Sequence, residues 1–148
     1  MASSSSQSIQ NYHYHVFLSF RGSDTRQTFV SHLYKALCNR GILTFKDDRE
    51  LEKGDSITDE ICRAIRSSRF AVVVISENYA SSRWCLDELQ LIMELQLGGE
   101  LTVFPIFYRV EPSDVRYQKG CFAESFQKHE TRENAENVSS WRKALNRL

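Results

Sequence analysis

Residues 70–76, with the sequence FAVVVIS, give the strongest indication of how this chain folds. Valine, isoleucine and phenylalanine dominate the segment, and all three residue types favour β-strands. Apolar side chains occupy consecutive positions, so in a strand they point to both faces of the sheet. The pattern therefore predicts a buried strand that is covered on both faces.

Helical patterns flank this strand on both sides in the sequence. Before it, isoleucine recurs at helical spacing at positions 57, 61 and 65. Ser56 is placed to cap the start of that helix. After the strand, residues 84–97 (WCLDELQLIMELQL) have the length of a helix and end at two glycines. The chain is therefore expected to run from helix to strand to helix in this region.

The same alternation extends over the rest of the chain. Three further apolar runs predict strands, at residues 15–20 (HVFLSF), 42–45 (ILTF) and 101–108 (LTVFPIFY). Helical patterns are found at residues 29–40, 115–130 and 138–148. Strands that alternate with helices favour right-handed crossovers and a parallel sheet with helices on both faces, so the predicted fold class is α/β.

The ligand site of such a sheet lies beyond the carboxyl ends of its strands, where the strand order reverses. For the order 2-1-3-4, this place lies between the first and the third strand. Residues 20–22 follow the first predicted strand, residues 76–84 follow the third, and the acidic loop of residues 46–56 follows the second. We expect the functional site among these three segments.

Length and composition exclude several classes of protein. The chain has 148 residues, with 19 Lys and Arg against 19 Asp and Glu, which is the size of one domain without net charge to attract a polyanion. No apolar run approaches the roughly 18 residues of a membrane span, and no signal-peptide pattern is present. We expect a protein of the cytoplasm, with the nucleus as an additional location, that binds neither membranes nor nucleic acid. Residues 1–12 are expected to be a disordered Ser-rich tail, and residues 13–148 to form the domain.

Trp84 and Glu88 are the most informative pair of candidate site residues. They are four residues apart in a predicted helix, so their side chains point in one direction at the margin of its buried face, beside the expected ligand site. A carboxylate next to an indole can bind a cationic or sugar-bearing ligand. The alternative is a glutamate at the rim of the core whose tryptophan neighbour only packs. Asp87, between them, is expected to point away from the core.

Two other charged features each have two interpretations. Arg21 can bind a phosphate, or it can pair with Asp24 or with the acidic loop. The acidic side chains of that loop resemble a divalent-metal cluster: Asp47, Asp48, Glu50 and Glu52. An exposed, solvated loop is the simpler interpretation, so no metal is expected. No phosphate-binding, dinucleotide-binding or nucleophile-elbow motif occurs, which leaves ATPases, Rossmann dehydrogenases and serine hydrolases without support.

Five stretches together resemble a known family. In chain order they are HVFLSFRGSDTR (15–26), FVSHLYKAL (29–37), TFKDDRELEKGDSI (44–57), VVVISENYASSRWCLDEL (72–89) and PIFYRVEPSDVR (105–116). Their combination is similar to the motifs of the plant Toll/interleukin-1 receptor (TIR) domain of the disease-resistance type, as a TIR-only or truncated form. The resemblance implies a flavodoxin-like three-layer sandwich with the parallel sheet order 2-1-3-4. It also implies that the chain stops short of the family's fifth strand and last helix.

For plant members, the resemblance implies an NAD+-cleaving activity that produces nucleotide signals in innate immunity and cell death. Glu88 would be the catalytic glutamate, and NAD+ would be a substrate, with no cofactor needed. The residues implied to line the NAD+ pocket are Phe20, Arg21, Gly22, Phe45 and Trp84. The loop implied to gate that pocket includes Asp47, Asp48, Glu52 and Gly54.

The resemblance also implies association with other TIR domains and with copies of the same chain, through Ser31 and His32. By its spacing alone, His32 next to the apolar stripe of its helix is a packing or contact residue rather than a catalyst. A second function therefore stays open, in which the chain is a non-catalytic adapter or decoy that pairs with longer resistance receptors. The two functions differ in whether the chain itself releases nicotinamide from NAD+.

Overall fold

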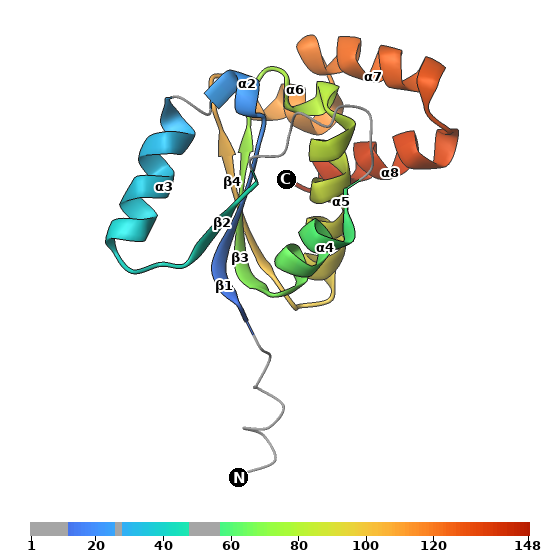
Figure 1. Cartoon of the computed structure of the whole chain (residues 1–148). Helices are drawn as coiled ribbons and strands as arrows, with labels where there is room; N and C mark the ends of the chain where they lie inside the picture. Colours follow the sequence, from blue (N-terminus) through green and yellow to red (C-terminus); the bar gives the residue numbers. More distant parts are fainter. Residues whose placement is uncertain (1–11, 26–27, 48–56) are drawn as a thin grey trace.

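The computed structural model of the chain describes residues 12–25, 28–47 and 57–148. At its centre is a parallel sheet in the order β2-β1-β3-β4 (Figure 1). The strands are β1 (Tyr14–Phe20), β2 (Thr44–Lys46), β3 (Ser68–Ile75) and β4 (Thr102–Phe107). The predicted strand order is confirmed, and each strand begins and ends within a residue or two of the segment expected for it.

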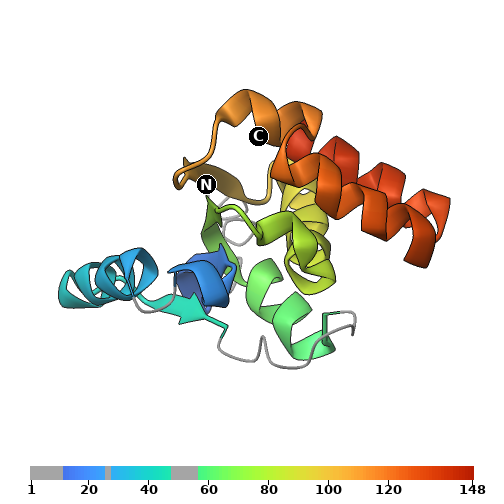
Figure 2. The ribbon, with the colours of Figure 1, turned by 90° about the horizontal axis from the view of Figure 1, so that it is seen from above.

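Helices lie on both faces of the sheet (Figures 1 and 2). One face carries α3 (Phe29–Asn39), and the other carries α4 (Asp59–Arg66) and α5 (Arg83–Leu97), with α8 (Ala135–Asn146) packed against α5. The other elements are α2 (Gly22–Thr25), the short 3-10 helix η1 (Tyr79–Ser81), α6 (Pro112–Tyr117) and α7 (Cys121–Arg132). This is the expected three-layer α/β sandwich. In the described part of the chain, none of the helices has the length and apolar character needed to cross a membrane.

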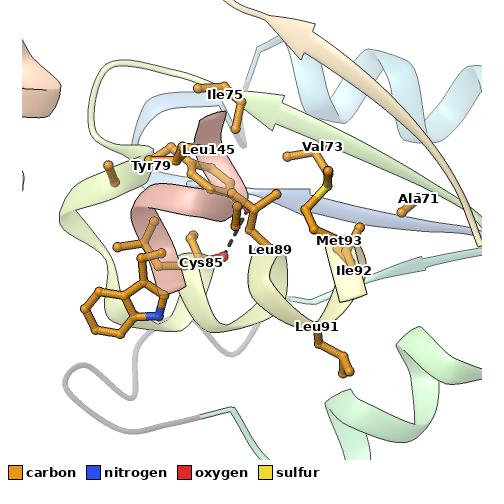
Figure 3. Packing of buried hydrophobic residues seen from close by; sticks show 14 of the residues in the cluster. Ala71, Val73, Ile75, Tyr79, Cys85, Leu89, Leu91, Ile92, Met93 and Leu145 are labelled. Atoms are coloured by element: carbon orange, nitrogen blue, oxygen red, sulfur yellow. Dashed lines mark hydrogen bonds between the residues drawn. The ribbon is translucent and has the colours of Figure 1, made fainter. Parts of the chain in front are cut away.

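Alternation along the central strands builds two separate cores. On β1, Phe17 belongs to the core that also includes residues of α4, α5 and α8, whereas its neighbour Leu18 belongs to the core that includes residues of α3. On β3, Val73 and Val74 divide in the same way. Figure 3 shows part of the larger core, where side chains of β3 and α5 meet: Ala71, Val73, Ile75, Leu89, Ile92 and Met93. The segment FAVVVIS is thus covered on both faces, as predicted.

The helix before β3 begins later than predicted. Its N-cap is Thr58, whose hydroxyl accepts a hydrogen bond from the backbone N–H of Ile61 at 3.3 Å. Ser56, the predicted cap, lies outside the described residues. Two hydroxyl residues compete for the cap in this stretch. Thr58 is directly followed by Asp59 and Glu60, whose negative charges favour the first turn of a helix.

The single helix predicted over residues 115–130 is wrong, because two helices, α6 and α7, share this segment. Gln118, with a φ of 51°, has the left-handed conformation that ends α6, and Gly120, with a φ of 59°, directly precedes α7. Val115 and Phe122, on either side of the break, are both buried in the same core. Apolar spacing therefore continues across the break and conceals it in the sequence.

Helix α5 is buried on more sides than its sequence pattern predicts. Asp87, expected to point into solvent, is half-buried and accepts a hydrogen bond from Nε1 of Trp141 on α8 at 3.1 Å. Burial raises the pKa of Asp87, and the Trp141 hydrogen bond and the charge of Arg83 lower it by less. The prediction for Asp87 failed because periodicity within one helix carries no information about a second helix that covers its polar side.

Candidate functional site

Helix α5 places Glu88 close to the carboxyl end of β1. The hydroxyl of Ser82 caps the helix by accepting from the backbone N–H of Cys85 at 3.2 Å. Cys85 in turn donates its thiol to the carbonyl of Phe20, the last residue of β1, at 3.4 Å. The side chains of Glu88 and Trp84 are both buried, with Glu88 only 2% exposed. The pair therefore lies inside the core at this end of the sheet and not at its rim.

Each oxygen of the Glu88 carboxylate accepts a hydrogen bond. Ser19 of β1 donates its hydroxyl to Oε1 at 2.7 Å, and Trp84 donates its indole Nε1–H to Oε2 at 3.1 Å. Both donors are buried, and hydrogen bonds to an ionised acceptor are stronger than those between neutral groups. The two contacts hold the carboxylate in one orientation.

Tyr79 extends this network behind Ser19. Its phenol oxygen lies 2.7 Å from the Ser19 hydroxyl, and its O–H also reaches the carbonyl of Cys85 at 3.1 Å (Figure 3). Burial, with smaller contributions from Cys85 and Glu88, raises the pKa of Tyr79 well above its ordinary value of 10.0. The phenol therefore keeps its proton and remains a donor.

Asp47 joins the site from the segment after β2. The Nε1–H of Trp84 donates to Oδ2 of Asp47 at 2.8 Å, so one N–H serves two carboxylates. Asp47 is only 8% exposed, and the prediction of an exposed loop is wrong at this residue because its carboxylate finds a buried donor. The other acidic-loop residues named above, Asp48, Glu50, Glu52 and Gly54, lie outside the described residues.

Glu88 lines a small cavity with Leu18, Phe20, Asp47 and Trp84. Its volume is about 10 Å³, which is room for about one water molecule. Two residues of the predicted NAD+ pocket, Phe20 and Trp84, thus meet Glu88 here. Small-molecule sites usually measure about 300–1,000 Å³, so this cavity is too small for a ligand of that kind unless side chains around it move.

A larger cavity of about 820 Å³ lies at the opposite end of the sheet, beside Tyr14 at the start of β1. Phe45 lines this cavity, stacked on Phe17 at 5.4 Å between ring centroids. Phe45 is therefore not brought to the Glu88 cavity. Two arginines and two glutamates line the larger cavity: Arg63, Arg66, Glu60 and Glu100. Because both signs of charge are present, the charge of the cavity favours no class of ligand.

Asp24 ties together the loops that follow β1 and β3. It accepts hydrogen bonds from the Ser76 hydroxyl at 2.5 Å and from the backbone and side-chain N–H groups of Asn78 at 2.8 and 3.0 Å. Burial raises the pKa of Asp24, but these hydrogen bonds and the charge of Arg21 outweigh it and lower the pKa. Arg21 thus lies near Asp24, one of its two predicted environments. Gly22 is buried at the start of α2.

The two predicted self-association residues lie apart from this cavity. Ser31 and His32 are exposed on α3, which covers the face of the sheet opposite α5 (Figure 2). They do not meet Glu88, and their side chains are accessible to another molecule.

Sequence reasoning missed Ser19 and Tyr79. Ser19 follows Phe17 on the face of β1 that packs against α5, where an apolar side chain is expected. A hydroxyl at such a position needs a buried partner, and this was the signal that could have identified it. For Tyr79 the sequence offered no comparable signal, because it lies in the single-turn helix η1, which is too short to show an apolar pattern.

The arrangement of charges suits stabilisation of a positive charge. Glu88 and Asp47 bring two carboxylates to one buried indole, in a place from which water is largely excluded. Carboxylates in such a setting interact strongly with a cation that forms next to them. Over the residues that the structure describes, no group of three or more His, Cys, Asp or Glu side chains is arranged to hold a metal ion.

Comparison with known sequences gives a consistent family. The chain matches the TIR-domain family model over residues 13–148. It is 57% identical to TMV resistance protein N of Nicotiana glutinosa, over 99% of this chain and 13% of that protein. It is 56% identical to disease resistance protein RPV1 of Vitis rotundifolia, over 89% of this chain and 9% of that protein. The chain thus spans about a tenth of the length of these curated relatives.

Solved structures agree with the sequence matches. The TIR domains of the activated Roq1 resistosome, which directly recognises the pathogen effector XopQ, superimpose with a TM-score of 0.83 and 54% identity, over 90% of this chain and 82% of that chain. The TIR domain of the Toll-related receptor TRR-2 from Hydra magnipapillata gives a TM-score of 0.50 and 27% identity, over 66% of this chain and 73% of that chain. With its parallel 2-1-3-4 sheet and its match over residues 13–148, the chain belongs to the TIR-domain family, in its plant disease-resistance branch.

Proposed function

We propose that the chain is an NAD+ glycohydrolase of plant immune signalling, with Glu88 as its catalytic residue. The observation that carries the proposal is the Glu88 carboxylate itself, buried at the carboxyl end of β1 with a donor on each oxygen. This is the position at which open α/β sheets bind their ligands. The relationship to plant resistance proteins supports the signalling role.

One carboxylate is sufficient for this reaction. In an ordinary glycosidase a second carboxyl group protonates the leaving group, but the positively charged nicotinamide of NAD+ leaves as a neutral molecule without a proton. The bond between C1′ of the ribose and the nicotinamide nitrogen breaks, and its electron pair leaves with nicotinamide. The ribose then carries the positive charge that Glu88 stabilises. Water completes the reaction by forming the new bond to C1′ and releasing a proton.

Substrate binding requires Asp47 or Trp84 to move, because the cavity beside Glu88 holds only about 10 Å³. The Trp84 indole that now donates to Asp47 then becomes available to stack on the nucleotide. Phe20, next to Trp84 in the cavity, adds an apolar wall. Arg21 and Gly22 follow Phe20 directly along the chain, and in this proposal they bind a phosphate group of the nucleotide.

The test is nicotinamide release from NAD+ by the purified chain, measured by chromatography. Glu88→Gln keeps the shape of the side chain and removes its charge, so we expect the rate to fall by about 100- to 1,000-fold. Glu94→Gln is the matched control, because Glu94 is an exposed glutamate on the same helix and its variant should keep the parent rate. Equal rates for the parent and Glu88→Gln would rule out this assignment.

A second candidate function is association with longer TIR proteins. The exposed position of Ser31 and His32 on α3 favours it, as does the similarity to TIR domains within the Roq1 resistosome. We expect the chain to co-purify with full-length TMV resistance protein N, and His32→Glu to reduce the captured amount several-fold. Gln127→Glu, which adds one negative charge on exposed α7, should have no effect. A parent that binds protein N but releases no nicotinamide would favour the adapter over the enzyme.

A further inference from the structure

Ser19 is a polar residue at the centre of the fold. It lies near the end of β1, with 0% of its side chain exposed. Its hydroxyl oxygen is 2.7 Å from Oε1 of Glu88 and 2.7 Å from the phenol oxygen of Tyr79. A buried hydroxyl between two such partners forms a chain of three oxygens that runs from η1 through β1 to α5.

The number of protons limits the directions in which the hydrogen bonds among these three oxygens can run. Ser19 has one hydroxyl proton, which cannot point at Glu88 and at Tyr79 at the same time. Tyr79 also has one proton, and it keeps that proton because burial raises the pKa of its phenol. Two acceptors compete for the Tyr79 proton, the Ser19 hydroxyl at 2.7 Å and the Cys85 carbonyl at 3.1 Å. The direction of these hydrogen bonds therefore depends on whether Glu88 is ionised or protonated.

Building on the proposed function, we infer that Ser19 and Tyr79 are positioning residues that hold the Glu88 carboxyl group in place in both of its charge states. When Glu88 is ionised, Tyr79 donates to Ser19 and Ser19 donates to Oε1. When Glu88 carries a proton, it donates to Ser19, Ser19 donates to Tyr79, and Tyr79 donates to the carbonyl of Cys85. Both arrangements satisfy every donor and differ only by rotation of hydroxyl groups.

The reaction gives a reason for two charge states. Glu88 is ionised while positive charge develops on the ribose, and the water that attacks C1′ must lose a proton afterwards. In this proposal Glu88, which lines the cavity, accepts that proton and later passes it to solvent. A carboxyl group that turned away when protonated would have to be repositioned in each cycle. The hydroxyl chain removes that step, because its heavy atoms stay where they are.

Other ionisable groups face Glu88 from the surrounding elements. Asp47 reaches it through the shared Trp84 indole, and Tyr79 through Ser19. Cys62 of α4 lies within electrostatic reach: burial, and more weakly the charge of Glu88, raise the pKa of its thiol. These groups are present in the parent and in every variant below, apart from Tyr79 where it is the residue changed.

The first experiment compares pH profiles of nicotinamide release. In Ser19→Ala one donor to Oε1 is lost, so we expect kcat to fall by about 10- to 100-fold with KM within about twofold of the parent. The acidic limb of the pH profile should also move to higher pH, by about one unit, because the ionised form of Glu88 is less stabilised. Tyr79→Phe should move the limb in the same direction by less, since Ser19 can still donate to Glu88.

Ser68→Ala is the matched control. Ser68 is also a buried strand serine, 1% exposed, but its hydroxyl donates at 2.7 Å to the carbonyl of Ala64, at the other end of the sheet. Ser68→Ala loses a comparable buried hydrogen bond, so its unfolding temperature should fall by about as much as that of Ser19→Ala. The pH profile should stay that of the parent. A profile that moves equally in Ser68→Ala would show a general effect of destabilisation and overturn the inference.

A second measurement separates the inference from the proposed activity. Side-chain carboxyl resonances of ¹³C-glutamate-labelled protein are titrated, with Glu88 assigned by its absence in Glu88→Gln. An upward shift of the Glu88 midpoint in Tyr79→Phe and in Ser19→Ala, but not in Ser68→Ala, supports the hydroxyl chain even if the protein releases no nicotinamide. If the parent releases nicotinamide but the Glu88 midpoint is the same in all variants, the proposed function stands and the role of Ser19 and Tyr79 is refuted. If Ser19→Ala does not fold, Tyr79→Phe decides alone, because it removes a single atom.

Discussion

At the scale of single residues, buried or partly buried polar side chains hold the candidate site in place and join the loops that follow β1 and β3. Glu88 is held by Ser19 and Trp84, and Asp24 joins the loop after β1 to the loop after β3. In both places a carboxylate accepts a hydrogen bond from a residue that is far away in sequence, Ser19 for Glu88 and Ser76 for Asp24. Such contacts are strong because the acceptor is charged and shielded from water.

Asp24 should therefore make the fold sensitive to acid. Its pKa is lower in the folded chain than its ordinary value of 3.8, so its contribution to stability is complete above that value and is lost as the pH falls through the folded value. We expect Asp24→Asn to reduce the free energy of unfolding at pH 7 by about 1–2 kcal/mol. The difference from the parent should shrink toward pH 2.

Urea unfolding at a series of pH values measures this difference. Glu77→Gln, an exposed neighbour with the same change of charge, should leave the unfolding free energy close to that of the parent. A constant difference between the parent and Asp24→Asn from pH 7 to pH 2 would show that shape and not charge is responsible.

At the scale of secondary-structure elements, α5 has two roles. One side of it packs on the sheet and presents Glu88, while the other side is covered by α8. The hydrogen bond from Trp141 to Asp87 and the ion pair of Arg83 with Glu133, at 3.3 Å, join α5 to the C-terminal part of the chain. This double coverage makes α5 a rigid support for the site.

The coverage by α8 reduces stability at Asp87, because it partly buries the carboxylate of this residue. Burial raises its pKa above its ordinary value of 3.8, so the folded chain holds the proton more tightly than the unfolded chain does. Its charge therefore lowers stability as the pH rises above that value. We expect Asp87→Asn to unfold at a higher urea concentration than the parent at pH 7, with the gain disappearing at low pH. A lower midpoint at pH 7 would mean that attraction to Arg83 outweighs burial.

At the scale of the whole molecule, the described sheet is covered unevenly. Its edge strand β4 carries Phe104, which is 51% exposed and touches Phe70 at 5.7 Å between ring centroids. Partly exposed apolar neighbours, Val72 and Ile106, continue this surface toward α3. An apolar sheet edge of this kind favours association between molecules.

Phe104→Lys should reduce that association without unfolding the chain. We expect light scattering of concentrated protein to fall, because a charged side chain on an edge strand opposes pairing of edges. Thermal unfolding should change little, since the side chain is already half in water. Leu97→Lys is the control, because Leu97 is also an exposed apolar residue, at 64%, but lies at the end of α5 and not on an edge strand. A similar decrease for both variants would point to net charge as the cause.

Much of the fold was predictable because its signals are local. FAVVVIS and the other apolar runs mark their strands, and the helices between them impose parallel pairing. Trp84 and Glu88 were predictable as neighbours because helical spacing alone brings them together. The break at Gln118 was not predictable, since both flanking helices bury their apolar residues in the same core.

The order of the elements, the resemblance to a family and the choice of Glu88 as candidate all follow from the sequence alone. Periodicity and linear motifs suffice for these, because they depend on residues that are close along the chain. The folded chain was needed to show that Ser19, Tyr79 and Asp47 converge on Trp84 and Glu88, and that Phe45 lies at another cavity. Contacts between distant segments depend on strand register and helix packing, and no local pattern encodes which buried donor meets which acceptor.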